Sequence, residues 1–272
     1  MQPYRKLLIA SAKGGVGKST TALGIASALT ENRADSGVGR TLLCDLDVTS
    51  RSLDLLLGAE SLTTADFTDV LYSPAASAAV HPIESRPGLS FIKASTYDRL
   101  CTVAERESAE SPEELAARAV RLIMADESFD CFVFDTGGEC EIPYEIAADV
   151  DMAIVTSEQS ATSIRAAEYA AERLIRSGCR KVRLVICGFD LTAVKRERRA
   201  GIIEMIDRCS LPCLGVVPFD KTLARAQDRG TLPGDRALST IAYRNIAARL
   251  LGEEIPLFYG MGRLYRRRSL AF

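Results

Sequence analysis

The glycine-rich run Ala12-Lys13-Gly14-Gly15-Val16-Gly17-Lys18-Ser19-Thr20 constrains the fold of this chain more than any other feature. The run follows the apolar stretch 7–10 and precedes the helix-forming stretch 21–26, so it lies at a strand–loop–helix corner. Glycines let such a loop curl until several N–H groups point at one anion, and the following helix adds the positive end of its dipole. We therefore predict a loop that binds phosphate.

The side chains of the loop suggest which phosphate compound it binds. Lys18 is placed to neutralise the β and γ phosphates of a nucleoside triphosphate, and the Ser19 hydroxyl to ligate Mg²⁺. The loop departs from the standard pattern in having Ala12 where a first glycine is usual, and it carries an extra lysine, Lys13. A glycine-rich turn without a ligand is the alternative. The predicted nucleotide-binding residues of the loop are Gly14, Gly15, Val16, Gly17, Lys18, Ser19 and Thr20.

Apolar runs alternate with helix-forming stretches along most of the chain. The predicted strands are Lys6–Ser11, Thr41–Asp45, Leu89–Lys93, Cys131–Asp135, Met152–Thr156, Val182–Cys187 and Leu214–Val217. The predicted helices are Lys18–Thr30, Ala65–Leu71, Pro112–Asp126, Ser160–Ser177, Arg196–Arg208, Thr222–Arg229 and Ala237–Leu251. Strands rich in Val, Ile and Leu without alternation are typical of a parallel sheet buried on both faces. The prediction is one α/β domain with a single doubly wound, mostly parallel sheet and helices on both faces.

Two segments are predicted to be irregular. Asn32–Arg40 is polar and contains glycine, so it is expected to be a surface loop between the first helix and the second strand. Residues 73–88 contain three prolines and are expected to run irregularly over the surface.

Three aspartates follow predicted strands at the edge where the phosphate loop lies. Asp45 ends the predicted strand 41–45 and Asp47 comes shortly after it, while Asp135 ends the predicted strand 131–135. Asp45 and Asp135 are predicted to help hold Mg²⁺ together with Ser19, because an acidic residue beside a phosphate loop usually does this through water. Asp47, two residues beyond the strand, is better placed to orient or deprotonate an attacking water. The alternative is that each aspartate only caps a turn or helix.

The C-terminal segment differs in charge from the rest of the chain. Residues 255–272 carry +4 and no acidic residue, which leaves −6 on the remainder of a chain whose net charge is −2. We therefore predict an acidic domain over residues 1–254 and a basic, amphipathic tail over 255–272. On a helix, Leu257, Met261, Leu264 and Tyr265 would share one side and Arg263, Arg266 and Arg267 another. The prediction is that residues 257–272 bind an anionic membrane surface; the alternatives are a disordered tail or one docked on the domain.

The eight cysteines mostly occupy apolar, strand-like contexts, which indicates buried, reduced thiols in a cytoplasmic protein. Cys209 and Cys213 are the one pair whose spacing could suit a metal or iron–sulfur site, but no second pair accompanies it. The first apolar run is short and leads directly into the phosphate loop, so neither a secretory signal nor a spanning segment is predicted.

Lys13 and Lys18 in one loop, followed by Asp45-Leu46-Asp47 and then Asp135, resemble the deviant-Walker ATPases of the MinD/ParA family. The resemblance covers about residues 5–256 and is strongest to the MinD branch, as in Leu214-Gly-Val-Val-Pro218 and in the stretch 243–256. It implies a P-loop NTPase fold of the SIMIBI type. It also implies hydrolysis of ATP with Mg²⁺.

The resemblance also implies how the protein works. Two ATP-loaded subunits would form a homodimer in which Lys13 of one subunit reaches the phosphates bound by the other. Lys13, Lys18, Asp47 and Asp135 would be the catalytic residues, while Gly138, Pro218 and Asp220 would add nucleotide contacts. The enzyme would act as a spatial regulator of division-site placement. It would be cytoplasmic and peripheral at the inner face of the cell membrane, with a protein regulator or effector of division as partner.

Three departures from the family pattern limit what can be transferred. Cys187-Gly188 replaces the usual Asn-Arg, so adenine contacts are expected to shift to Pro218, Phe219 and Asp220, or base selectivity to be loose. The segment 166–168 lacks the acidic run that MinD uses toward its inhibitor partner. The segment 136–138 is Thr-Gly-Gly where Ser-Pro-Ala is usual.

Three alternative functions of the same superfamily stay open. A ParA-type DNA-partitioning ATPase would bind phosphates with the tail arginines and with Arg196, Arg198 and Arg199. A MinD-like ATPase could instead position another polar organelle. A carrier of iron–sulfur clusters would need Cys209 and Cys213 as ligands. Sequence-specific nucleic-acid binding is not expected.

Overall fold

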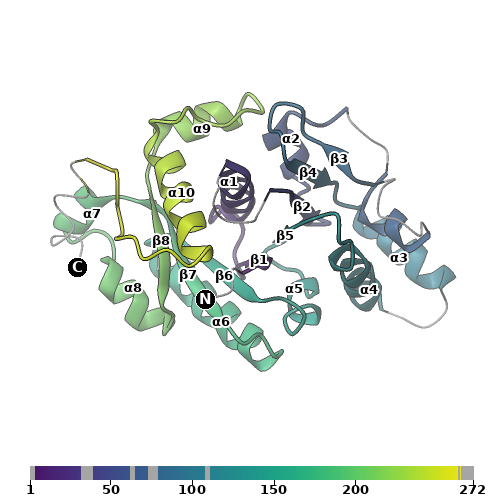
Figure 1. Ribbon diagram of the computed structural model, residues 1–272. Coiled ribbons are helices and arrows are strands. Elements are labelled where there is room, and N and C mark those ends of the chain that lie inside the picture. Colours follow the sequence, from purple (N-terminus) through teal and green to yellow (C-terminus); the bar gives the residue numbers. More distant parts are fainter. Residues whose placement is uncertain are drawn as a thin grey trace.

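The computed structural model describes residues 4–31, 39–61, 65–72, 79–107, 111–262 and 264. Its centre is an eight-stranded sheet in the order β3-β4-β2-β5-β1-β6-β7-β8 (Figure 1). The strands are β1 (Lys6–Ala10), β2 (Thr41–Leu46), β3 (His81–Pro82), β4 (Leu89–Ile92), β5 (Cys131–Thr136), β6 (Met152–Ser157), β7 (Val182–Phe189) and β8 (Cys213–Pro218). All neighbouring strands are parallel except β3, which pairs antiparallel with β4. The predicted fold class is confirmed.

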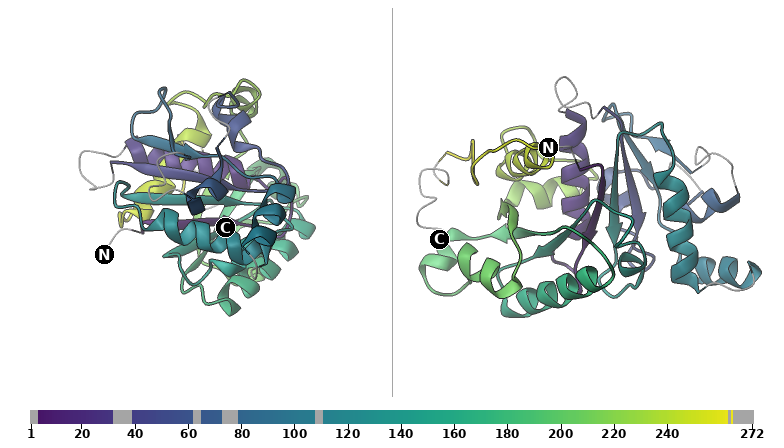
Figure 2. Two further views of the ribbon diagram at one scale, coloured as in Figure 1. Left: turned by 90° about the vertical axis from the view of Figure 1, so that its right-hand side faces the viewer. Right: turned by 60° about the horizontal axis from the view of Figure 1, so that its bottom comes forward.

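Helices cover both faces of the sheet (Figures 1 and 2). On one face α1 (Lys18–Glu31) and α10 (Leu238–Leu250) pack against each other, with α9 (Lys221–Gln227) at their end. On the other face α4 (Pro112–Met124), α5 (Ile142–Glu145), α6 (Ala161–Arg176) and α8 (Ile202–Cys209) form a row. The remaining elements are α2 (Leu53–Leu57), the 3₁₀ helix η1 (Phe67–Tyr72), α3 (Tyr97–Arg106) and α7 (Leu191–Lys195).

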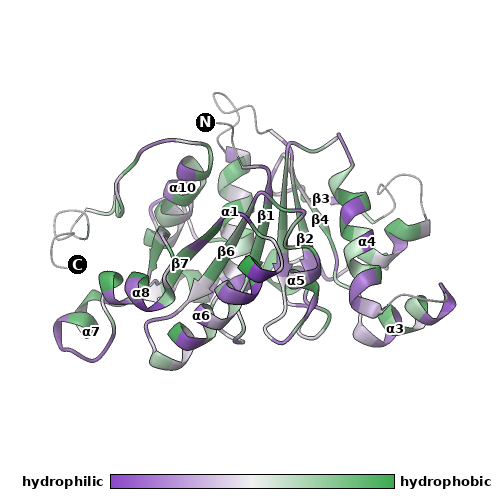
Figure 3. Ribbon diagram, turned by 90° about the horizontal axis from the view of Figure 1, so that it is seen from below, coloured by the Kyte–Doolittle hydropathy of each residue, from purple (hydrophilic) through white to green (hydrophobic). Residues whose placement is uncertain are grey.

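Burial explains why these residues form these elements. The central strands are apolar at nearly every position, and β2, β5 and β6 are buried throughout, as strands covered on both faces must be. Figure 3 shows this apolar sheet between helices whose outer sides are hydrophilic. Helix α1 is buried along most of its length because it lies between the sheet and α10. The packing is close: a Cβ on Gly24 would lie 2.4 Å from the ring of Tyr243.

Several predicted elements differ from the structure. The predicted helix Arg196–Arg208 is confirmed only in its second half, as α8, and is wrong over 196–201: α7 ends at Lys195, Glu197 has a φ of 53°, and α8 begins after Gly201. A positive φ at a non-glycine residue breaks a right-handed helix, which is why the arginine-rich stretch separates the two helices. The segment predicted as helix 65–71 is the 3₁₀ helix η1. Elements α2, α3, α5 and α7 and strand β3 were not predicted.

The predicted irregular segments lie only partly within the described residues. Positions 32–38 and 73–78 lie outside them. Within 79–88, His81–Pro82 forms the edge strand β3, so this part is more regular than the prolines suggested. Pro82 occupies an edge strand, where the missing N–H disturbs the ladder least.

The start of the C-terminal tail packs against the domain. In the described part, residues 257–262 form turns, with Phe258 and Met261 buried. The rings of Phe258 and Phe189 lie 6.0 Å apart, and Asn245 of α10 donates a hydrogen bond of 2.8 Å to the carbonyl of Tyr259. Arg263 and residues 265–272 lie outside the described residues, so the amphipathic helix stays a prediction. Among the helices described, none is long and apolar enough to cross a membrane.

Candidate functional site

The phosphate loop connects the end of β1 to the start of α1, as predicted. β1 lies between β5 and β6, where connections leave toward both sides of the sheet, and ligands of doubly wound folds bind at the carboxyl ends of strands at such a point. Gly15 and Gly17 have φ angles of 73° and 90°, a region that side chains other than glycine's rarely allow. Lys18 is buried, and its Nζ donates a 3.0 Å hydrogen bond to the carbonyl of Lys13.

Gly138 lies directly against the phosphate loop. A Cβ at this position would lie 2.9 Å from the nitrogen of Gly14 and 3.0 Å from the carbonyl carbon of Lys13. A Cβ on Gly137 would lie 3.0 Å from Oδ1 of Asp47. The two glycines that depart from the family pattern therefore bring the backbone after β5 into contact with the loop and with Asp47.

This contact gives a prediction for Gly138→Ala. The methyl group meets backbone atoms that cannot rotate away, so the loop must shift at a cost of about 1–3 kcal/mol. We expect nucleotide affinity to fall about tenfold or more, measured by titration with a fluorescent ADP analogue. Gly234→Ala is the matched control, because a Cβ at that position has no atom within 4 Å. Equal effects of the two substitutions would contradict the role of this contact.

Two carboxylates lie side by side beneath the loop. Asp45 of β2 and Asp135 of β5 are register partners on adjacent strands, and both are fully buried. Asp45 accepts hydrogen bonds from the backbone nitrogens of Asp47 and Leu53. Neither oxygen of Asp135 has a hydrogen-bond partner.

Burial raises the pKa of both carboxyl groups, and for Asp45 the nearby Asp135 raises it further. For Asp135 the Ser19 hydroxyl and the Lys18 ammonium oppose this shift, although neither reaches the carboxylate in hydrogen-bond geometry. Burial also lowers the pKa of Lys18, against the attraction of Asp135 and Asp47. Buried carboxylates with too little compensating positive charge are costly, so the site is suited to a further cation.

The donor set fits Mg²⁺. Ser19 Oγ and the unpartnered Asp135 carboxylate offer hard oxygen donors at the loop, with Asp45 behind them, and Mg²⁺ typically uses one or two such groups plus phosphates and water. Ser19 Oγ accepts a hydrogen bond of 3.1 Å from Ser52, which the sequence did not indicate. Among the described residues no group of three His, Cys, Asp or Glu side chains could hold a metal alone.

Asp47 lies just beyond β2 and is held in a turn. Its Oδ1 accepts hydrogen bonds from the backbone nitrogens of Thr49 and Ser50 and from the Thr49 hydroxyl. The capping role considered from the sequence is therefore real for this residue. It leaves Oδ2, for which no hydrogen bond is found among the described residues, as the atom that can face a water.

Lys13 points away from the loop that contains it. Its Nζ donates hydrogen bonds to Ser163 Oγ at 2.8 Å and Thr162 Oγ1 at 3.2 Å, at the start of α6. Ser160, the N-cap of α6, donates to Ser163 Oγ in turn. These hydroxyls were missed from the sequence; the only signal was the cluster of Ser and Thr at 160–163.

Three residues that the sequence analysis connects with binding of the nucleotide base are Pro218, Asp220 and Cys187. Pro218 ends β8, and Asp220 caps α9 and also accepts two hydrogen bonds from Ser239, so its oxygens are already used within the fold. The thiol of Cys187 lies beneath the loop, 3.4 Å from Thr21 Oγ1, and burial raises the pKa of this thiol to about 11. Gln227 donates a 2.6 Å hydrogen bond to Thr20 Oγ1, a contact that the sequence did not predict.

The two cysteines considered as cluster ligands contact separate backbone carbonyls. Cys209 Sγ lies 3.8 Å from the carbonyl of Ile164, and Cys213 Sγ lies 3.5 Å from that of Gly215. Burial raises the pKa of each thiol to about 11, which favours the protonated form over a metal-binding thiolate.

A model of the CobQ/CobB/MinD/ParA nucleotide binding domain matches residues 7–233. The chain belongs to this family. The MinD/ParA resemblance drawn from Lys13, Lys18 and the three aspartates is thereby confirmed, and the protein is a nucleotide-binding P-loop protein of this family.

Relatives of known name extend the match over nearly the whole chain. The septum site-determining protein MinD of Bacillus subtilis is 28% identical over 261 residues, which span 92% of this chain and 90% of that protein. The MinD subunit of the MinC:MinD cell division complex of Aquifex aeolicus superposes with a TM-score of 0.77 at 25% identity, covering 92% of this chain and 97% of that one. MinD of Pyrococcus horikoshii, solved with Mg-ADP, shares the fold with a TM-score of 0.70 at 17% identity over 90% and 95% of the two chains.

Proposed function

We propose that this chain is a MinD-like ATPase that dimerises with ATP and helps to place the division site from the inner face of the cell membrane. The observation that supports this most is the match to MinD proteins over nine-tenths of both chains. The arrangement of Lys13, Lys18, Asp45 and Asp135 around the loop agrees with it. The MinC:MinD complex of Aquifex aeolicus suggests a MinC-like protein as the regulator that this chain would bind.

The residues of the site divide the proposed chemistry among them. Backbone N–H groups of the loop and Lys18 bind the β and γ phosphates, and Gly138 brings its own backbone to the same place. Mg²⁺, held by Ser19 and Asp135 with Asp45 behind them, would neutralise charge on the phosphate oxygens. Asp47 orients the attacking water. Lys13 of a second subunit completes the site, since a lysine is a mobile point charge on a long stem.

Membrane attachment is the part of the proposal that depends on the tail. Each arginine near an anionic surface contributes about 1 kcal/mol. One short tail therefore binds weakly, whereas two tails on an ATP-bound dimer bind far better through effective concentration. ATP would in this way control when the protein is on the membrane.

The test is co-sedimentation with vesicles of phosphatidylglycerol and phosphatidylethanolamine, with ATP or ADP. The intact chain is compared with one that ends at Gly262, because Phe258 and Met261 are buried and must be kept. We expect ATP-dependent pelleting of the intact chain and a loss of at least about tenfold on truncation. A variant with Arg263, Arg266, Arg267 and Arg268 changed to Gln tests charge without shortening the chain. If ATP fails to promote pelleting but promotes salt-sensitive DNA binding, the ParA-type alternative replaces this one.

A further inference from the structure

A recess lies along the second half of α1, toward the end of the helix that is away from the phosphate loop. It occupies about 450 Å³, including the part open to solvent, and is formed by the second half of α1, the 231–237 connection and α10. Its apolar wall consists of Ala28, Leu223, Leu232 and Pro233.

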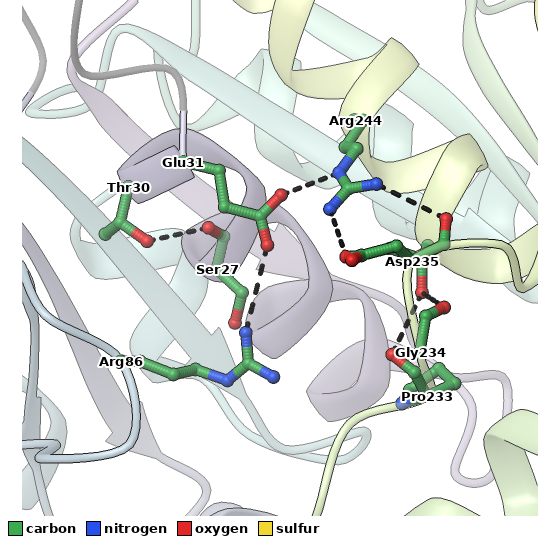
Figure 4. A network of polar contacts seen from close by, with 9 residues as sticks. Ser27, Thr30, Glu31, Arg86, Pro233, Gly234, Asp235 and Arg244 are labelled. Carbon is green, nitrogen blue, oxygen red and sulfur yellow. Dashed lines mark hydrogen bonds and ion pairs between the residues drawn. The ribbon is translucent and has the colours of Figure 1, made fainter.

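The charged side of this recess contains two arginines, Arg244 and Arg86, that differ in how many hydrogen bonds their guanidinium groups make (Figure 4). Arg244 donates to Glu31 Oε2 and to Asp235 Oδ1, both at 2.6 Å. Arg86 forms an ion pair of 4.0 Å with Glu31 and is also attracted by the carboxylate of Asp235, but its guanidinium makes no hydrogen bond to any residue that the structure describes. Its side chain is 26% exposed, and burial lowers its pKa. Within the described part of the chain, the N–H groups of the Arg86 guanidinium are therefore available as hydrogen-bond donors at a partly buried position.

Ser27 of α1 adds an independent observation. The residue is 4% exposed, it lines the recess, and its hydroxyl has no hydrogen-bond partner. In Figure 4 this hydroxyl is directed toward the guanidinium end of Arg86. Buried hydroxyls are nearly always hydrogen-bonded, so an unpartnered one beside the guanidinium of Arg86 leaves room for an acceptor that both groups can bind.

We propose that this recess binds a small organic carboxylate, whose oxygens accept from Arg86 and Ser27 and whose apolar part lies on Leu223, Leu232 and Pro233. A planar carboxylate matches the fork of a guanidinium, which can donate two parallel hydrogen bonds to it. A phosphate dianion fits less well than a carboxylate. The carboxylate of Glu31 lies 4.0 Å from Arg86, and it repels a ligand of charge −2 more strongly than a ligand of charge −1. The site is separate from the phosphate loop and goes beyond the proposed ATPase function.

The test uses benzoate as the probe on the full chain saturated with ADP and Mg²⁺, so that the phosphate loop is filled. Ligand-observed NMR should show saturable binding of benzoate in the millimolar range and much weaker binding of benzyl alcohol, its neutral analogue. Arg86→Gln should weaken benzoate binding at least about tenfold, and Ser27→Ala should weaken it several-fold. Arg86→Lys, which keeps the charge but loses the fork, should bind with intermediate affinity.

Arg176→Gln is the matched control, because Arg176 lies on α6 at the opposite face and is bonded to Glu172. It should leave benzoate binding unchanged. The melting temperature of each variant reports whether it folds. The proposal is overturned if benzoate does not bind saturably to the ADP-saturated wild-type chain, if Arg86→Gln binds it as tightly, or if benzoate binds only when ADP and Mg²⁺ are left out.

Discussion

Replacing Lys13 with Ala is expected to abolish ATP turnover while leaving ATP binding nearly intact. In the single chain the ammonium of Lys13 is bonded to Thr162 and Ser163 of α6, and only its backbone carbonyl contacts Lys18. Its side chain therefore contributes little to the nucleotide held by its own loop. We expect ATP affinity to change less than about threefold, turnover to fall at least about 100-fold, and the ATP-induced dimer to disappear.

Three measurements separate these effects. Affinity is read from titration with a fluorescent ATP analogue, turnover from phosphate release, and dimer formation from light scattering after gel filtration. Lys18→Ala is the matched control, since it removes a buried lysine of the same loop and should lose nucleotide binding itself. Ser163→Ala removes one contact of Lys13 in the single chain and should not lower turnover. Normal turnover by Lys13→Ala would refute the cross-subunit role.

The parts of the site that the sequence predicted are those with a local physical cause. A glycine-rich loop between a strand and a helix can be recognised from its own residues, because Gly15 and Gly17 adopt positive φ angles there. The approach of Asp45 to Asp135 follows from parallel strands, whose carboxyl ends share one edge. The loop needs no information beyond its own residues, and the two aspartates need only the general geometry of a parallel sheet.

The features that were missed depend on contacts between distant segments. Lys13 meets Ser163 across about 150 residues of sequence, and the recess behind α1 joins segments around 27, 86 and 235. The break between α7 and α8 was missed because Arg and Glu have high helix propensity, and nothing in the local sequence indicates the positive φ of Glu197. The packing of Phe258 was missed for the same reason, because its contact with Phe189 joins residues far apart in the sequence.

Asp135→Asn is expected to make the nucleotide-free protein more stable and the enzyme inactive. Both oxygens of Asp135 are buried without a hydrogen-bond partner, and the register partner Asp45 is also buried. Removing one of two neighbouring buried charges should raise the free energy of unfolding by about 1–2 kcal/mol in the absence of metal and nucleotide. The same change removes an oxygen ligand proposed for Mg²⁺, so turnover should fall at least about 100-fold.

The pH dependence of stability gives a second readout of the same charges. Burial raises the pKa of Asp135 and Asp45, so the folded chain keeps protons that the unfolded chain has released. The unfolded state then binds fewer protons, and these groups make the metal-free protein less stable as the pH rises from about 4 through their raised pKa values. Asp135→Asn should reduce this loss, measured by urea unfolding at several pH values in EDTA.

Asp130, which precedes the same strand β5, is the matched control because its environment has the opposite effect. Burial alone would raise the pKa of Asp130, but hydrogen bonds from the backbone nitrogens of Gly39 and Arg40 outweigh it and lower the pKa. Asp130→Asn should therefore destabilise the chain by about 0.5–1.5 kcal/mol and leave turnover in place. A carboxylate that costs stability in the empty protein but is needed for turnover belongs to the site. If Asp135→Asn destabilises the metal-free chain as Asp130→Asn does, Asp135 is a structural residue and the proposed Mg²⁺ ligands are wrong.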